Sequence, residues 1–171
     1  MLKRWILILL AGSGGLAAFA ATAAGSPGGL IHLYETSTHG PGAPGAVVIT
    51  GAINDAGTGN ATGAITSPGT VTLSKGSIKV VPSPTLISRE QDLYGAPVKP
   101  PGCAFAGTIN GPVKIVSGTG AYAGITGTFN ATYTAAAVLT KRQNGTCDTG
   151  HGVRPVGAAI FIRASGSVSL K

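Results

Sequence analysis

Residues that could carry out chemistry are few in this chain, and they are spread along its length. The 171 residues include five acidic side chains, three histidines and two cysteines. His32, His39 and His151 show no metal-ligand spacing with Cys103 and Cys147, so we expect no metal site. An isolated cysteine pair in an exported protein instead predicts a disulfide, with two free thiols as the alternative. Closing the 45 residues from 103 through 147 would stabilise the fold by about 4 kcal/mol.

The densest motif is the glycine-rich stretch from Gly118 to Gly127, which contains Gly-x-Gly-x-x-x-Gly. This pattern differs by one residue from the dinucleotide fingerprint, which also needs a helix after the turn to receive a pyrophosphate. A strand-like run follows here, so we expect no nucleotide and no other cofactor. The chain has no Gly-x-Ser-x-Gly, His-Glu-x-x-His or phosphate-loop motif. We interpret the stretch as a tight structural turn with one packed tyrosine, formed by Gly118, Gly120, Tyr122, Gly124 and Gly127.

The N-terminus reads as a secretory signal. Lys3 and Arg4 precede the apolar run from Trp5 to Leu10, which thins into small residues suited to a signal-peptidase site. A membrane-spanning helix, the alternative, needs about 20 strongly apolar residues, and glycines interrupt this run. We therefore predict a signal peptide over 1–24 and a single secreted domain over 25–171, with no membrane span once the signal is removed.

Charge and composition narrow the class of partner. The formal net charge is +7 and falls to +5 without Lys3 and Arg4. This balance favours anionic partners such as wall polymers or lipid headgroups. After the signal the basic residues are scattered, and only Lys141 and Arg142 are adjacent, so we do not expect nucleic-acid binding.

The pattern of apolar residues predicts an all-β domain. Period-two alternation recurs between glycine- and proline-rich turns, and no segment after the signal shows convincing helical periodicity. Several short strands with small residues on their faces predict a small closed antiparallel barrel of about eight strands, with a two-sheet sandwich as the alternative. Turns are expected at 54–59 and loops at 82–102 and 141–155. The expected strands cover 30–36, 46–53, 60–65, 70–81, 103–117, 128–140 and 157–170.

Two places leave the strand count open. The alternation changes phase at Lys75-Gly76, which predicts a β-bulge or, alternatively, a tight hairpin. At Asn110-Gly111 the alternation keeps its phase, which favours one long strand over a hairpin. Cys103 and Cys147 then fall at the same end of the sheet. Pro112 must point outward or occupy a bulge, because proline cannot donate to a strand ladder.

Two stretches carry a family resemblance. The segment from Ser117 to Gly127 resembles the glycine-rich strand–turn–strand of the allene oxide cyclase-like and dirigent-like barrels, particularly their exported bacterial branch. Leu33-Tyr34-Glu35 is similar to the Tyr-Glu pair on the first strand of the plant cyclases. The resemblance implies an eight-stranded antiparallel barrel, often trimeric, with an apolar molecule in its lumen. It also implies a catalytic role for Glu35, although Ser37 stands where the cyclases have asparagine.

Glu35 shares a strand face with Ile31 and Leu33, which places it in the lumen. A carboxylate there can stabilise positive charge or act as an acid. Our first hypothesis is a barrel that binds or shields a small apolar ligand, and the second is a cyclase- or isomerase-like enzyme using Glu35. The third is a structural envelope protein whose barrel is filled by its own side chains. A lumen of at least about 300 Å³ would favour the first two.

Overall fold

A computed structural model describes residues 28–38, 43–60, 68–96, 98, 101–149 and 153–171. The predicted signal peptide, residues 1–24, lies outside this range, as do His39 and His151. Within the described ranges, no helix has the length and apolar character needed to cross a membrane.

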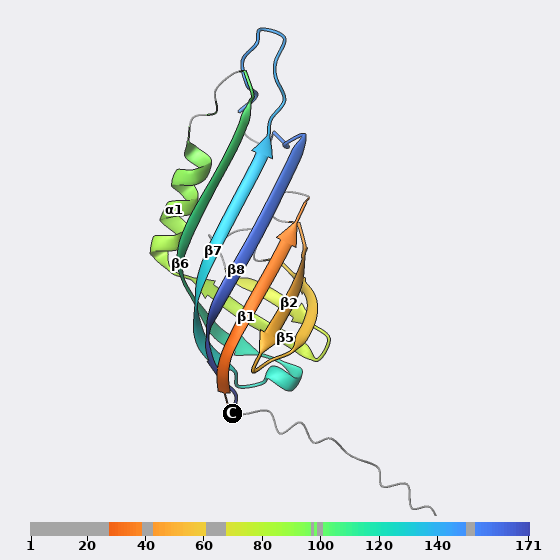
Figure 1. The fold of residues 1–171 in the computed structure, drawn as a ribbon, viewed down its shortest axis with the longest axis vertical. Coiled ribbons are helices and arrows are strands. Elements are labelled where there is room, and N and C mark those ends of the chain that lie inside the picture. Colours follow the sequence, from red (N-terminus) through yellow and green to blue (C-terminus); the bar gives the residue numbers. More distant parts are fainter. Residues whose placement is uncertain (1–27, 39–42, 61–67, 97, 99–100, 150–152) are drawn as a thin grey trace, which may run out of the picture.

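The described chain forms a closed barrel of eight antiparallel strands, as the sequence pattern predicts (Figure 1). The first strand pairs with the second on one side and with the last on the other, so the ladder has no break between its first and last members. The two-sheet sandwich is therefore wrong. In chain order the strands are β1 (Gly28–Ser37), β2 (Gly45–Gly51), β3 (Asp55–Gly59), β4 (Gly69–Leu73), β5 (Gly76–Pro82), β6 (Ala104–Gly118), β7 (Thr126–Val138) and β8 (Gly157–Ser169).

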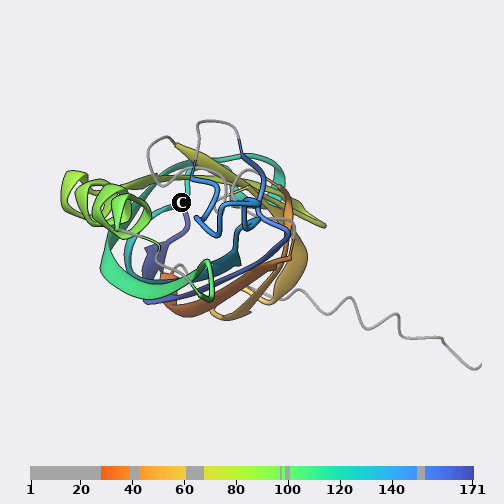
Figure 2. The ribbon, with the colours of Figure 1, turned by 90° about the horizontal axis from the view of Figure 1, so that it is seen from above.

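The barrel is uneven in length. β6, β7 and β8 contain 15, 13 and 13 residues, whereas β2 to β5 contain between five and seven. The long strands therefore continue past the short ones at one end (Figure 1), which we call the wide end because the larger hollow described below lies there. The opposite end is the narrow end, and Figure 2 shows the barrel along its axis. Pro82 at the end of β5 pairs with Val113, so residues 104–112 of β6 have no strand partner on that side among the described residues.

A helix occupies the place beside this unpaired part of β6. The helix α1 (Pro84–Gly95) corrects our prediction of a loop over 82–102 without helical periodicity. Ser83 caps it, since its Oγ accepts a hydrogen bond from the Leu86 N–H at 3.2 Å, and Pro84 stands in its first turn. Pro82 and Pro84, which indicated a loop, therefore stand at the start of a helix. Leu86 and Glu90, four residues apart, form its buried face.

Two other expectations change in the first half of the chain. β3 covers Asp55–Gly59, where we predicted a turn. Of the strand expected at 60–65, only Asn60 is among the described residues, and it lies just after β3. Repeated glycine in Asp55–Gly59 gives the appearance of a turn. At Lys75-Gly76 the hairpin is correct and the bulge is wrong, since Leu73 pairs with Gly76 across the turn.

The second half of the chain follows the prediction closely. β6 is one continuous strand through Asn110-Gly111, and Pro112 is exposed on its outer face. The disulfide between Cys103 and Cys147 is present, with the two Cα atoms 5.2 Å apart. It joins the wide-end start of β6 to the connection between β7 and β8.

The glycine-rich turn closes the narrow end of the barrel. Gly120 and Gly124 have φ values of +59° and +78°, a region that side-chain-bearing residues rarely adopt. Tyr122 lies in the 3₁₀ turn Gly120–Tyr122, is buried in the core, and donates its hydroxyl to the carboxylate of Asp55. Asp55 also accepts a hydrogen bond from the Ser74 hydroxyl at 2.5 Å. One carboxylate thus connects β3, the β4–β5 turn and the glycine-rich turn.

This junction predicts an acid-dependent stability difference. Hydrogen bonds from Ser74 and Tyr122 hold the pKa of Asp55 well below its ordinary value. A carboxyl with a lowered folded-state pKa stabilises the fold above the unfolded-state pKa of about 3.9 and loses that effect as the pH falls further. We therefore expect Asp55→Asn to have a lower Tm than the wild type at pH 7, with the difference shrinking below about pH 4. Thermal unfolding between pH 2 and 7 measures it, and a constant difference would contradict this role.

Candidate functional site

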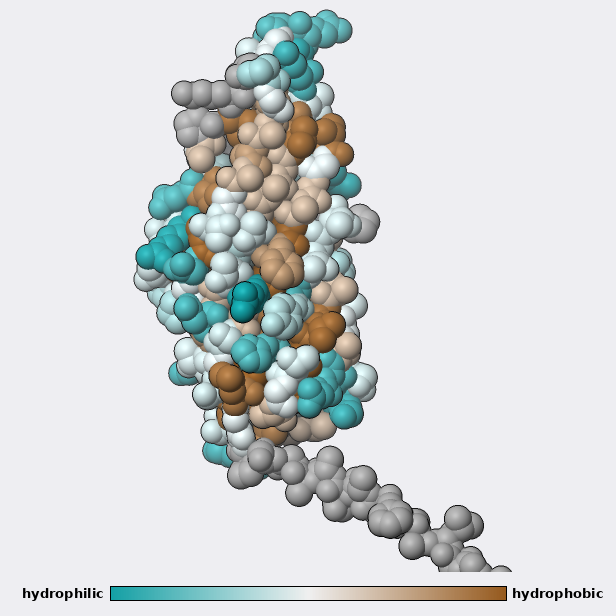
Figure 3. All heavy atoms as spheres, in the orientation of Figure 1, coloured by the Kyte–Doolittle hydropathy of each residue, from teal (hydrophilic) through white to brown (hydrophobic). Residues whose placement is uncertain are grey.

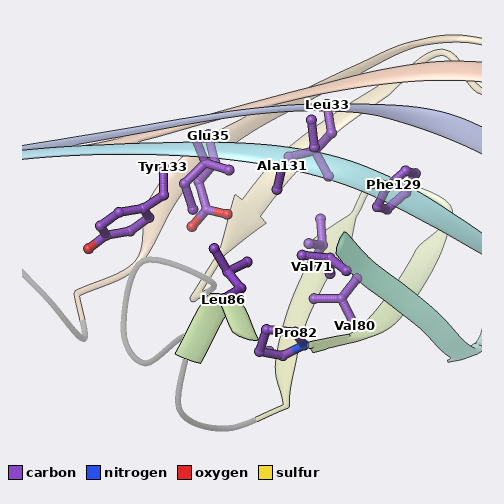
Figure 4. A pocket seen from close by; sticks show the side chains of 13 residues that line it. Leu33, Glu35, Val71, Val80, Pro82, Leu86, Phe129, Ala131 and Tyr133 are labelled. Carbon is purple, nitrogen blue, oxygen red and sulfur yellow. The ribbon is translucent and has the colours of Figure 1, made fainter. Parts of the chain in front are cut away.

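The barrel contains a small apolar cavity beside α1 (Figure 4). Its volume is about 50 Å³. Side chains from most of the strands and from α1 surround it, and almost all of the exposed wall is carbon. The lining residues are Leu33, Glu35, Gly69, Val71, Val80, Pro82, Leu86, Val113, Phe129, Ala131, Tyr133, Ile162 and Ala164.

Glu35 is the one acidic residue in this wall, as the strand-face prediction requires. Its side chain is 0% exposed, and its carboxylate points into the cavity in the direction of Leu86 (Figure 4). Two glycines leave room for it: a Cβ at Gly59 would lie 2.7 Å from Glu35 Oε2, and one at Gly45 would lie 3.1 Å from Oε1. The sequence therefore provides bare backbone on β2 and β3 where the carboxylate packs.

Tyr133 lies beside Glu35, and Tyr94 lies beyond Tyr133 toward the wide end. Tyr133 on β7 is 1% exposed, and its hydroxyl points away from the cavity to the hydroxyl of Tyr94 on α1, 2.6 Å away (Figure 4). Tyr94 also packs edge-on against the ring of Phe105, with centroids 5.6 Å apart. Glu90, one helical turn before Tyr94, is 4% exposed.

Burial sets the protonation state of these phenols. It is the main cause that raises the pKa of Tyr133 far above its ordinary value, and the bond to Tyr94 and the charges of Glu90 and Glu35 act in the same direction. Burial likewise raises the pKa of Tyr94. Both tyrosines are therefore neutral hydrogen-bonding groups at physiological pH and not bases. The inner cavity therefore combines an apolar wall with one carboxyl group, which suits an apolar molecule with one polar end, and the two neutral phenols bond to each other at its edge.

A second, wider hollow of about 1190 Å³ lies at the wide end, on the other side of the tyrosine pair. Tyr94 and Phe105 line it, together with Arg154 and the small residues Ala135 and Ala137 of β7. Tyr133 lines the inner cavity and Tyr94 lines this hollow, so their hydrogen bond marks the boundary between the two spaces.

The other residues considered from the sequence lie elsewhere. His32 is on the outer face of β1, and the disulfide and the glycine-rich turn occupy opposite ends of the barrel from one another. In the portion of the chain that the structure describes, no group of three or more His, Cys, Asp or Glu side chains could hold a metal ion.

Sequence reasoning missed the role of Tyr133, Tyr94, Glu90 and Leu86. Tyr133 shares its parity with the inward residues Phe129 and Ala131, a signal that was available. The other three belong to the segment that we predicted to be a loop.

No protein-family model, curated protein or solved structure matches the chain. The fold and the cavity together define a class of protein, a closed eight-stranded antiparallel barrel with a small apolar lumen that contains one buried glutamate.

Proposed function

We propose that this protein is an exported barrel that binds a small, largely apolar molecule in its lumen, with the polar end of that molecule at Glu35. The observation that carries the proposal is a fully buried glutamate in an otherwise apolar wall. Removing a carboxylate from water costs several kcal/mol, and an apolar residue of similar volume often stabilises a core as well or better. Packing alone therefore gives no reason for a glutamate at this position.

The size of the cavity limits the bound group. Sites for drug-sized ligands occupy about 300–1,000 Å³, whereas this cavity encloses about 50 Å³. In the closed form described here, the lumen can take only a group of a few atoms. A larger ligand needs one wall of the lumen to withdraw.

The same small volume favours a second candidate, a structural envelope protein whose barrel is filled by its own side chains. The two functions differ in what Glu35 contributes. A filled barrel should tolerate Glu35→Leu or gain stability from it, because the desolvation cost of the carboxyl group disappears. A binding barrel should lose its ligand in the same variant.

Glu35→Gln tests the binding function directly. The amide keeps the volume but removes the charge, and a hydrogen bond to a charged group contributes about 1.5–3 kcal/mol. We therefore expect the amount of small molecule that co-purifies with the protein, measured by native mass spectrometry, to fall at least about tenfold. Asp92→Asn on the exposed side of α1 is the matched control and should leave it unchanged. A protein that carries no small molecule, combined with a Glu35→Leu variant of unchanged or higher Tm, would favour the filled barrel.

Localisation and assembly belong to the same proposal. The disulfide is compatible with export, in agreement with the predicted signal peptide. The family resemblance implies a trimer. Figure 3 shows weakly apolar surface over the long strands at the wide end, and Val138 of β7 and Phe161 of β8 are both more than 40% exposed. Light scattering of the purified protein tests for the trimer.

A further inference from the structure

The helix α1 forms part of the lumen wall in a different way from the strands. Each strand of the barrel is hydrogen-bonded to a neighbour on both sides through its backbone. In contrast, only the N-cap of α1 is joined to β6 through the backbone, where the Ser83 N–H donates to the Pro112 carbonyl at 2.9 Å. Beyond this point α1 reaches β6 and β7 through side chains: Arg89 Nη1 donates to the Asn110 carbonyl at 2.7 Å, and the Tyr94 hydroxyl meets that of Tyr133. The helix can therefore move without breaking a strand ladder.

Two leucines of α1 fit two gaps on β6. A Cβ built at Gly111 would lie 3.0 Å from Leu86 Cβ, and one built at Gly107 would lie 2.1 Å from Leu93 Cδ1. Seven helical residues span about 10.5 Å and four strand residues about 13 Å, so the two spacings nearly match. The helix consequently rests on bare backbone of β6 through these two side chains.

Leu86 also closes the lumen. It is the one residue of α1 that lines the inner cavity, it is 1% exposed, and it lies opposite the Glu35 carboxylate (Figure 4). Its side chain occupies space that a ligand in the lumen would need. The other end of the helix carries Tyr94, which lines the wider hollow.

We propose that α1 is the movable wall of the lumen and that Leu86 sets the size of the group that the lumen accepts. This inference rests on the proposed binding function. Withdrawal of α1 breaks the Tyr94–Tyr133 hydrogen bond and lifts Leu86 and Leu93 from their glycines, which joins the small cavity to the wider hollow. The return of the helix closes the lumen over the bound molecule.

A disulfide between α1 and β6 tests this movement. In Leu93→Cys/Gly107→Cys, a sulfur in place of Leu93 Cγ would lie 3.5 Å from the Cβ at position 107, close enough for a bond after a small shift. Leu93→Ser/Gly107→Ser is the matched control, because it has similar volume and cannot form the bond. The probe is N-phenyl-1-naphthylamine, a neutral dye that fluoresces in apolar surroundings and is not attracted by the positive surface.

We expect the dye to enter the wild type and the serine control at similar rates, and the oxidised cysteine variant at least about tenfold more slowly. Adding Leu86→Ala to the locked variant should restore uptake, because it enlarges the lumen without requiring movement, whereas adding Ile87→Ala should not. Equal uptake by the locked and serine variants would overturn the movable wall and leave the binding function standing. If only the variants that carry Leu86→Ala take up the dye and the wild type does not, the proposed binding function of the native lumen would be overturned.

Hydrogen exchange gives a readout that needs no ligand. The amides of residues 88–95 should exchange faster than those of β6 in the wild type, and the lock should slow them at least about tenfold. If the amides of α1 exchange only as fast as the whole protein unfolds, α1 does not move independently, and the inference is overturned regardless of the dye result.

Discussion

Replacing both Cys103 and Cys147 with serine should lower the free energy of unfolding by about 4 kcal/mol. The bond joins residues 44 positions apart, and without it the unfolded chain regains the entropy of that large loop. The effect also has a local cause, since the bond links the wide-end start of β6 to the β7–β8 connection, where the short strands give no support. For a domain of this size, the expected fall in Tm is about 8–16 °C.

Thermal and urea unfolding measure this effect. The single variant Cys103→Ser should behave like the double variant, because either change removes the same bond. A fall in Tm of less than a few degrees in the double variant would show that the strand ladder alone holds the wide end together.

Gly166→Ala should be the most damaging small substitution in the last strand. A Cβ at this position would lie 2.0 Å from the Thr128 carbonyl oxygen and 2.7 Å from Phe129 Cα, both of which belong to the backbone of β7. Backbone atoms cannot move aside as a flexible side chain can, so strands of the barrel must separate. We expect a loss of about 3 kcal/mol or more, at or above the upper end of typical overpacking costs.

Gly157→Ala in the same strand is the control. Nothing lies within 4 Å of a Cβ at that position, and the change in stability should stay within about 0.5 kcal/mol. Urea unfolding of the two variants checks the contrast. Similar values for both would show that β8 can move away from β7 without cost.

The parts of the fold that sequence reasoning predicts correctly are those with strong local patterns. β6, β7 and β8 alternate over 13 or more residues, and alternation of that length is specific to a strand. β3 was missed because Asp55–Gly59 contains two glycines and no large apolar residue, and its pairing with β2 and β4 overrides its weak local preference. The helix was missed because Pro82 and Pro84 suggested a loop.

The candidate site could be predicted only in part, for the same reason. Glu35 could be placed in the lumen because β1 alternates regularly, and the structure puts it there. Leu86, Glu90 and Tyr94 reach the same region from a segment 50 or more residues later, and no local pattern shows where α1 packs. The volume of the cavity depends on how these side chains interlock, which strand alternation does not report.

The pairing of β1 with β8 affects how this chain can fold. Gly28 pairs with Ser169 and Ser37 with Ile160, so the first strand of the barrel has the last strand, made much later in synthesis, as its partner. Contacts between such distant parts of a chain form slowly, because a long intervening segment must first be ordered. A nascent chain in which β8 (Gly157–Ser169) has not yet been synthesised would expose two unpaired strand margins, on β1 and β7, that can join to other chains. The chain is therefore protected from this kind of aggregation only once β8 has paired with β1 and β7.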